Sequence, residues 1–367
     1  MKVLHIPTGG LLPDGIYSCI AAYFTAIDRD DLSLTLLATN SPSPAILEQA
    51  KKLDCGIKVI GGRKENPAEY ALSLYRYLKQ ERFDIVHVHG SSAIMSIELM
   101  AAQMAGCKVR IAHSHNTTCD NRKADKLLRP IFNHAYTHAF ACGNDAGRWL
   151  FRKREFTVIP NGRDLNKFKF DESQRQMWRK KFGVSDTTRV YGHVGRFNYQ
   201  KNHEYLIRIF NDIAALEPDS HLVLVGTGEN MEDIVKMVRE QGLTSKITFT
   251  GAIDNVHELL SAFDVMLLPS RFEGLPLVMI EWQANGLTCI ASDQITDECI
   301  ITQWAYTRDI IETPRVWCDL ARTCRLPDRV ESSRIGCEQL RERGYDIQIE
   351  AQRLKELYRR LIKEASK

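Results

Sequence analysis

The feature that most constrains this chain is a repeated alternation of short apolar runs with amphipathic segments. In the first half of the chain, strands are expected at residues 3–6, 34–39, 57–61, 84–89, 108–115, 139–143 and 156–160. Between them, residues 69–80 and 92–106 have the apolar spacing of helices. Continuous apolar strands that alternate with helices predict a parallel sheet covered by helices on both faces.

The alternation stops at Pro160-Asn161-Gly162, a turn-forming sequence, and a charged helix is expected over residues 171–182. It then restarts, with further strands expected at residues 190–196, 221–228, 247–251, 265–270 and 288–292. After residue 300 the pattern weakens, and the chain ends in a charged helix. The 367 residues suit two α/β domains, each a doubly wound parallel sheet of the Rossmann-like kind. We place the domains at residues 1–163, joined by the final helix at 347–367, and at residues 164–346.

Composition excludes several other classes. Apolar residues make up 44% and charged residues 26% of the chain, as in an ordinary globular protein. No run approaches the roughly 18–20 apolar residues of a membrane helix, and the opening MKVLHIPTGG reads as a first strand rather than a signal peptide. The ten cysteines are scattered without a C-x-x-C pair, so reduced thiols and a cytoplasmic location are expected.

The charge is unevenly distributed along the chain. Residues 1–160 hold 20 Lys and Arg against 15 Asp and Glu, whereas the whole chain has a net charge of +3. Residues 122–129 mix basic and apolar side chains. A basic first domain favours peripheral contact with the anionic inner face of the cell membrane, or a phosphate-bearing substrate. The alternative is an ordinary solvated helix, and no nucleic-acid partner is expected.

In a doubly wound domain, ligands bind at the carboxyl ends of the strands, so the residues there are the candidates for function. The most informative segment is EGLPLVMIE at residues 273–281, which follows a buried strand. Pro276 suits the first turn of a helix, whose amino end offers N–H groups to a diphosphate. Glu273 and Glu281 could each bind a hydroxyl, one of a sugar and one of a ribose. Taken by spacing alone, the segment fits a capped surface helix with two ordinary glutamates equally well.

Two further loops carry candidate groups. Arg196 and Lys201 follow the strand segment VYGHVG at residues 190–195 and could neutralise a leaving diphosphate, although such a pair is more often solvated surface. The turn at Gly228 is a weak glycine signal, equally consistent with a capped helix start.

His87-x-His89 and His113-x-His115 resemble a metal site, because four imidazoles could bind zinc. Alternating residues of a strand point to opposite faces of a sheet, so we expect each pair to be divided between the two faces. No Cys or carboxylate at ligand spacing joins the histidines. We therefore expect no metal, and instead one histidine of each pair directed toward the ligand-binding end.

Together these segments resemble family 4 retaining glycosyltransferases, also called group 1. The Glu-x7-Glu spacing of EGLPLVMIE matches the family signature, and four more segments match in order: residues 156–168, 192–207, 222–229 and 259–276. IAHSHNT at 111–117 and ASDQITDE at 291–298 resemble the branch that builds capsular and exopolysaccharides. The resemblance covers nearly the whole chain. It implies the GT-B fold, with two Rossmann-like domains facing each other across a cleft, and no essential metal or other cofactor.

The resemblance also implies roles for individual residues. Glu273 would contact the donor sugar and Glu281 the nucleotide ribose, while Arg196 and Lys201 would hold the diphosphate. His115 would stand beside the sugar and the reacting centre. The remaining donor-binding positions would be Gly15, Gly228, Gly274, Leu275, Pro276 and Leu277. Where the family usually has Gly-Gly, this chain has Asp14-Gly15, and a carboxylate there could repel phosphate or bind an acceptor hydroxyl.

The expected activity is transfer of a hexose-type unit, with retention, from a nucleotide diphosphate sugar to a glycan or lipid-linked glycan, in capsule or exopolysaccharide synthesis. The donor is expected to be UDP-linked. Two alternatives share the architecture. A sugar-nucleotide 2-epimerase would not need the Glu-x7-Glu pair, and a non-catalytic partner subunit would not need the full set of cleft residues.

Overall fold

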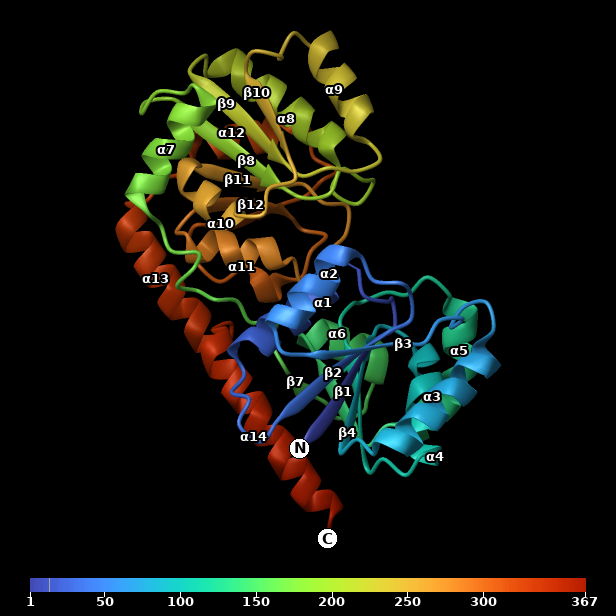
Figure 1. The fold of residues 1–367 in the computed structure, drawn as a ribbon. Helices are drawn as coiled ribbons and strands as arrows, with labels where there is room; N and C mark the ends of the chain where they lie inside the picture. Colours follow the sequence, from blue (N-terminus) through green and yellow to red (C-terminus); the bar gives the residue numbers. More distant parts are fainter. Residues whose placement is uncertain (13) are drawn as a thin grey trace. The chain divides into compact units, whose positions relative to one another are not determined.

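The computed structural model describes residues 1–12 and 14–367, which form two compact units. The first unit comprises Met1–Gly162 and Asp346–Lys367, and the second comprises Arg163–Tyr345 (Figure 1). Each is described by itself.

Within the described residues, the first unit is built on a seven-stranded parallel sheet of order β3-β2-β1-β4-β5-β6-β7. Its strands are β1 (Lys2–Pro7), β2 (Ser33–Ala38), β3 (Gly56–Val59), β4 (Ile85–Gly90), β5 (Val109–Ser114), β6 (His138–Ala141) and β7 (Thr157–Val158). The helices are α1 (Gly15–Ala26), α2 (Pro44–Lys52), α3 (Pro67–Glu81), α4 (Ser96–Met104), α5 (Arg122–Ala135), α6 (Asn144–Phe151) and α14 (Ile347–Ala365), with a short 3₁₀ turn at Ala93–Met95. Every residue of β4 is buried, as expected for a central strand covered on both faces.

The second unit repeats the plan with a six-stranded parallel sheet of order β10-β9-β8-β11-β12-β13. Its strands are β8 (Arg189–Val194), β9 (Ser220–Val225), β10 (Ile247–Gly251), β11 (Val265–Leu268), β12 (Thr288–Ser292) and β13 (Ala305–Arg308). The helices are α7 (Glu172–Phe182), α8 (His203–Leu216), α9 (Met231–Glu240), α10 (Val256–Leu259), α11 (Leu277–Ala284), α12 (Pro314–Thr323) and α13 (Arg329–Glu342), with 3₁₀ turns at Leu260–Ala262 and Asp297–Cys299. Both sheets run outward from their first strand in two directions, which confirms the predicted doubly wound, Rossmann-like class.

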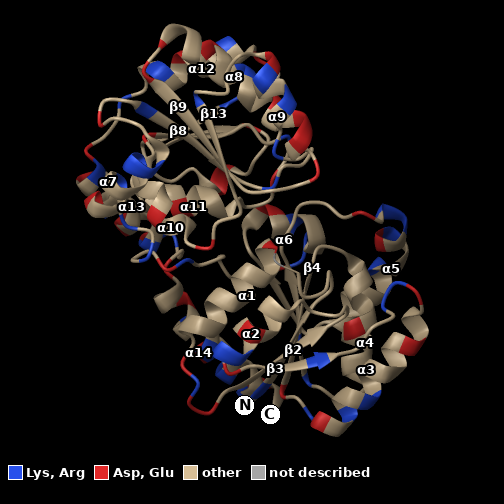
Figure 2. Ribbon diagram, turned by 45° about the horizontal axis from the view of Figure 1, so that its top comes forward, with Lys and Arg blue, Asp and Glu red and all other residues tan. Residues whose placement is uncertain are grey.

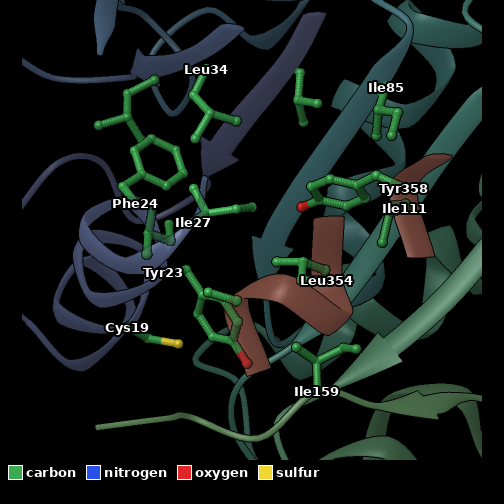
Figure 3. Packing of buried hydrophobic residues seen from close by; sticks show 14 of the residues in the cluster. Cys19, Tyr23, Phe24, Ile27, Leu34, Ile85, Ile111, Ile159, Leu354 and Tyr358 are labelled. Carbon is green, nitrogen blue, oxygen red and sulfur yellow. The ribbon is translucent and has the colours of Figure 1, made fainter. Parts of the chain in front are cut away.

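The C-terminal helix α14 belongs to the first unit, where it packs against α1 and the sheet. Figure 3 shows its Leu354 and Tyr358 among the buried side chains of that core. The chain leaves and re-enters this unit at one place, where Gly162 passes so close to Ile347 that a Cβ on Gly162 would lie 3.0 Å from the Ile347 Cα. The glycine of the predicted turn is therefore needed for two backbone segments to pass one another.

The sequence pattern missed β13 in the segment after residue 300. This strand at the sheet edge reads AYTR, and all four residues are half-buried. A half-buried edge strand lacks the continuous apolar run on which the other assignments depended. Among the described residues, no helix has the length and apolar character needed to cross a membrane.

Candidate active site

In each sheet the strand order reverses beside the first strand, and the loops that leave the carboxyl ends there are the usual ligand site of such folds. In the second unit this point lies between β8 and β11, which are paired neighbours. Residues 195–201 follow β8, and residues 269–276 lead from β11 into α11. The fold therefore brings together the two loops that carry Lys201 and Glu273.

The Glu273 carboxylate is the centre of this group. Its Oε1 accepts from Lys201 Nζ at 2.6 Å and from the Ser270 hydroxyl at 3.0 Å, and its Oε2 accepts from the Gln200 amide at 2.8 Å. The side chains of Lys201 and Glu273 are only 15% and 10% exposed. Three of the carboxylate's four acceptor positions are thus occupied, which fixes Lys201 in place and leaves Glu273 little freedom. The sequence placed Gln200 and Ser270 in these loops but assigned neither of them a role.

Helix α11 begins directly after this carboxylate. Pro276 is its N-cap residue and Leu277 its first residue, and no side chain caps it. The Glu273 N–H donates to the Gln294 carbonyl, and the next N–H groups along the chain are those of Gly274 and Leu275. The first amides of a helix have no partner within the helix, so they can donate to an anion. The predicted diphosphate-binding segment, residues 274–277, therefore stands beside the fixed ammonium of Lys201.

Glu281 lies on α11 and pairs with Arg163, whose Nε donates to Glu281 Oε1 at 3.0 Å. The side chains of Arg163 and Glu281 are 6% and 16% exposed. Burial raises the pKa of Glu281, and the charge of Arg163 opposes that rise. Arg163 is a site residue that sequence reasoning missed, although it directly follows the Pro-Asn-Gly turn.

Arg196 has a different partner from Lys201. Its Nε donates to Glu229 Oε2 at 3.1 Å, and both side chains are exposed, at 70% and 55%. The predicted cation pair is therefore divided: Lys201 is held by Glu273, and Arg196 by a carboxylate of the next loop.

Gly228 allows close packing between the loop after β8, which carries Arg196, and the loop after β9, which carries Glu229. A Cβ at this position would stand 2.3 Å from the Phe197 carbonyl oxygen, and that oxygen also accepts the Asn230 N–H. The absence of a side chain at Gly228 thus lets the two loops pack directly, which is a structural reason for the glycine independent of any ligand.

In the first unit, the prediction that each histidine pair is divided between the two faces of the sheet is wrong. The imidazoles of His87 and His89 are stacked with centroids 4.2 Å apart, and those of His113 and His115 lie 4.1 Å apart. Neighbouring strand residues alternate between faces, so residues two apart share one. His5 on β1, which is in register with His87, adds a fifth imidazole that the sequence analysis did not single out.

Burial keeps these imidazoles neutral. It lowers the pKa of His5, with help from Arg29, and that of His115 to about 3. It also lowers the pKa values of His87, His89 and His113 well below the ordinary range. Two groups of three, His5/His87/His89 and His89/His113/His115, have ring nitrogens close enough to serve as metal ligands. Their nitrogens bond to one another and to Tyr358 instead, and the expectation of no metal stays a prediction.

Gly15 is the first residue of α1, and the preceding Asp14 is its N-cap. The Asp14 carboxylate accepts from the Tyr17 N–H at 2.9 Å, which gives the unusual Asp-Gly pair a local structural purpose.

Comparison with known proteins finds similarity over most of the chain. The family described as Glycosyltransferase Family 4 matches residues 25–167, and that described as Glycosyl transferases group 1 matches residues 174–325. A Bacillus subtilis protein named as a glycosyltransferase, EpsF, is 31% identical over 95% of this chain and 93% of its own length. The Escherichia coli UDP-Gal:alpha-D-GlcNAc-diphosphoundecaprenol alpha-1,3-galactosyltransferase is 33% identical over 63% of each chain.

Solved structures share the fold at low sequence identity. HepE of Anabaena in complex with UDP superimposes with a TM-score of 0.80 at 16% identity, over 97% of this chain and 99% of its own. HepE has also been solved in complex with UDP-glucose, where the TM-score is 0.76 over the same shares of both chains. The fold is therefore GT-B, and the chain belongs to glycosyltransferase family 4, also called group 1, as a retaining enzyme that uses a nucleotide sugar.

Proposed function

We propose that this protein transfers a hexose unit from a UDP sugar to a lipid-linked glycan during capsular or exopolysaccharide synthesis. The observation that carries the proposal is the Lys201–Glu273 group at the amino end of α11, where a fixed cation meets free backbone amides. The name of the Escherichia coli relative gives a UDP sugar as donor and a diphosphoundecaprenol-linked sugar as acceptor, and HepE binds UDP-glucose. These relatives support the donor base and the acceptor class.

In this proposal the second unit binds the donor and the first unit the acceptor. Lys201 and the N–H groups of Gly274, Leu275 and Leu277 hold the diphosphate, and Arg196 joins them by exchanging Glu229 for phosphate. Glu281 binds the ribose through the oxygen that Arg163 leaves open, and the turn at Gly228 borders the nucleotide. Glu273 fixes Lys201 and uses its remaining acceptor position for a hydroxyl of the sugar. We further propose that His115 and Gly15, both in the first unit, contact the sugar or the acceptor.

The chemistry follows from these positions. As the bond between the anomeric carbon and the diphosphate oxygen breaks, negative charge grows on that oxygen, and Lys201 with the α11 amides stabilises it. The sugar becomes cationic at the same time. The acceptor hydroxyl forms its new bond on the face that the diphosphate leaves, and its proton passes to the departing diphosphate. Configuration at the anomeric carbon is thereby retained.

The test is an incubation of the purified protein with UDP-glucose, UDP-galactose and UDP-N-acetylglucosamine, with and without a synthetic lipid diphosphate sugar. Acceptor-dependent release of UDP and an elongated lipid product, both absent in Lys201→Met, are expected. Conversion of the nucleotide sugar into an isomer without UDP release would show an epimerase instead. No turnover with a panel of lipid acceptors, despite measured UDP binding, would contradict the proposal.

We also propose that α5 contacts an anionic membrane surface, where a lipid-linked acceptor would reside. Leu127 and Ile131 lie one turn apart on α5 and are 77% and 46% exposed, and Lys123 and Lys126 are exposed as well. Figure 2 marks the Lys and Arg positions along α5 in blue. Arg129 does not join this face, since it pairs with Asp125 and donates to the Leu150 carbonyl. Basic residues around exposed apolar ones suit an acidic bilayer, at about 1 kcal/mol for each charge.

Vesicle co-sedimentation tests this contact. Binding is expected on vesicles containing phosphatidylglycerol, and it should fall with added salt and in Leu127→Glu. Ile311→Glu, which alters an equally exposed apolar residue of the second unit, is the matched control and should bind as the parent does. Equal binding by both variants would contradict the assignment to α5.

A further inference from the structure

Five histidines of the first unit and Tyr358 of α14 form a continuous row of hydrogen bonds. The histidines are His5, His87, His89, His113 and His115. His115 Nε2 lies 2.9 Å from His89 Nδ1, and His89 Nε2 lies 2.9 Å from His5 Nδ1. His5 Nε2 lies 3.4 Å from the Tyr358 hydroxyl, which lies 2.6 Å from His87 Nδ1. His87 Nε2 then lies 3.0 Å from His113 Nδ1.

We propose that Tyr358 is a positioning residue that sets which ring nitrogen of His115 carries the proton, and that it makes His115 Nδ1 a hydrogen-bond acceptor. The proposal deepens the proposed function, because it rests on His115 lying beside the sugar.

A neutral imidazole has one N–H and one lone pair, so it donates through one nitrogen and accepts through the other. When imidazoles bond only to one another in a row, the tautomer of one ring fixes the tautomers of all the others. Burial supports this condition, because it keeps all five rings neutral at pH 7. The row of hydrogen bonds therefore has only two arrangements, which differ in the direction in which each ring donates its proton.

Tyr358 decides between them, because its hydroxyl has one proton and two imidazole neighbours. Bonds donated by O–H are shorter than bonds donated by N–H. The 2.6 Å separation fits donation from Tyr358 to His87 Nδ1, and the 3.4 Å separation fits a weaker bond donated by His5 Nε2 to the Tyr358 oxygen. Tyr358 itself is fully buried, and burial raises its pKa, so it remains a neutral phenol.

The direction then propagates to both ends. His5 accepts at Nδ1 from His89 Nε2, and His89 accepts at Nδ1 from His115 Nε2, so His115 is left with a lone pair on Nδ1. Among the described residues that nitrogen has no hydrogen-bond partner, and His115 is the half-buried member of the cluster. At the other end, His113 Nε2 carries a proton and is buried without a partner among the described residues.

The chemical consequence is specific. With its lone pair outward, His115 accepts a hydrogen bond from a sugar hydroxyl and cannot donate one to a phosphate oxygen. The C-terminal helix thus contributes to the site through Tyr358, although Tyr358 makes no contact with His115 itself.

The direct test is NMR of the full-length protein labelled with ¹⁵N-histidine at pH 7, using long-range ¹H–¹⁵N correlations that distinguish protonated from unprotonated ring nitrogens. His115→Gln assigns the His115 signals. We expect Nε2 protonated and Nδ1 unprotonated in the parent, and nitrogen shifts averaged between both tautomers in Tyr358→Phe. The opposite tautomer in the parent, or an unchanged one in Tyr358→Phe, would overturn the proposal.

Tyr23→Phe is the matched control. Tyr23 is buried in the same core, and its hydroxyl donates to the Pro160 carbonyl outside the chain of imidazoles. It should lose a buried hydrogen bond donated by its hydroxyl, as Tyr358→Phe also does, and leave the His115 signals unchanged. A similar change in both variants would indicate general loosening of the core and overturn the assignment to Tyr358.

A kinetic arm separates this inference from the proposed function. Once a donor and acceptor are found, Tyr358→Phe should lower kcat about two- to tenfold, the size of one neutral hydrogen bond, with an unchanged KM for the donor. The NMR experiment needs no substrate, so it tests the tautomer of His115 even if the proposed transfer is not observed. Tautomers as expected with an unaltered kcat would mean that His115 does not touch the sugar, and would overturn the link to catalysis.

Discussion

Replacing Glu281 tests the proposed nucleotide site most sharply, because the structure gives the side chain two separable roles. Its Oε1 neutralises the buried Arg163. Its other oxygen is proposed to accept from a ribose hydroxyl. Glu281→Ala should therefore weaken both the fold and nucleotide binding, whereas Glu281→Gln can still accept from Arg163 and from the ribose as a neutral group.

The expected magnitudes follow from these contacts. A hydrogen bond to a charged group contributes about 1.5–3 kcal/mol, so Glu281→Ala should weaken UDP binding about ten- to hundredfold. The loss in Glu281→Gln should be smaller, about tenfold or less, because a neutral hydrogen bond remains. Loss of the buried ion pair with Arg163 should also lower folding stability in Glu281→Ala, by up to about 3–5 kcal/mol.

Calorimetry with UDP and with its 2′,3′-dideoxy analogue isolates the ribose contact. The parent should prefer UDP strongly, and Glu281→Ala should bind the two nucleotides alike. Glu240→Ala, which removes an exposed glutamate of α9 in the same unit, is the control and should behave as the parent does. If Glu281→Ala weakened both nucleotides equally, the loss would come from disturbed folding, and the ribose assignment would be refuted.

Three further outcomes are expected. Lys201→Met should lower kcat about a hundred- to a thousandfold, as does loss of a group that stabilises developing negative charge, while Lys236→Met, an exposed lysine of α9, should leave steady-state turnover unchanged; equal effects would remove Lys201 from the mechanism. Turnover should persist in EDTA, because Lys201 and backbone amides supply the positive charge; a complete loss restored by added metal would instead implicate the histidine cluster. Acidification from pH 7 to 4.5 should lower the melting temperature steeply when followed by circular dichroism.

The sequence predicted the strands well because their apolar runs are local signals. It placed Glu273, Lys201 and residues 274–277 at one end of one sheet, and the structure brings them together there. What it could not predict are pairings between distant segments, such as Arg163 with Glu281, which lie 118 residues apart. Nothing in the periodicity of either segment specifies such a partner.

The histidines show a different limit. Their strands were predicted, but the two histidines of each pair were wrongly assigned to opposite faces of the sheet. Side chains alternate between the faces along a strand, so residues two apart lie on the same face. The role of Tyr358 was missed for another reason, because the sequence analysis described the final helix only as charged and considered none of its side chains. Its hydroxyl meets His87 from 271 residues away, and the parallel register that aligns His5 with His87 appears only once β1 and β4 are paired.

The same histidines should make the chain sensitive to acid. Burial lowers the native pKa values of these five imidazoles, to about 3 for His5 and His115, and all five protonate near pH 6.5 once the chain unfolds. The unfolded state therefore binds more protons between about pH 6.5 and 3, and stability is lost as the pH falls through that window. Each histidine contributes up to about 1.4 kcal/mol per pH unit, so all five together contribute up to about 7 kcal/mol per pH unit. Over a single pH unit this loss is comparable with the whole stability of a domain.

Glu281, whose pKa is raised by burial, opposes part of this loss, because it holds its proton more tightly in the native state. Five histidines gain protons on unfolding, whereas Glu281 alone tends to release one. Unfolding near pH 5.5 should therefore take up protons. Scanning calorimetry in buffers of different ionisation enthalpy measures that uptake directly. His134→Asn, which alters an exposed histidine of α5, should leave it unchanged, whereas His113→Asn should reduce it by about one proton. Net proton release on unfolding at pH 5.5 would show that the cluster is already charged in the folded chain, and a charged cluster could not hold the single-direction hydrogen-bond chain that fixes His115.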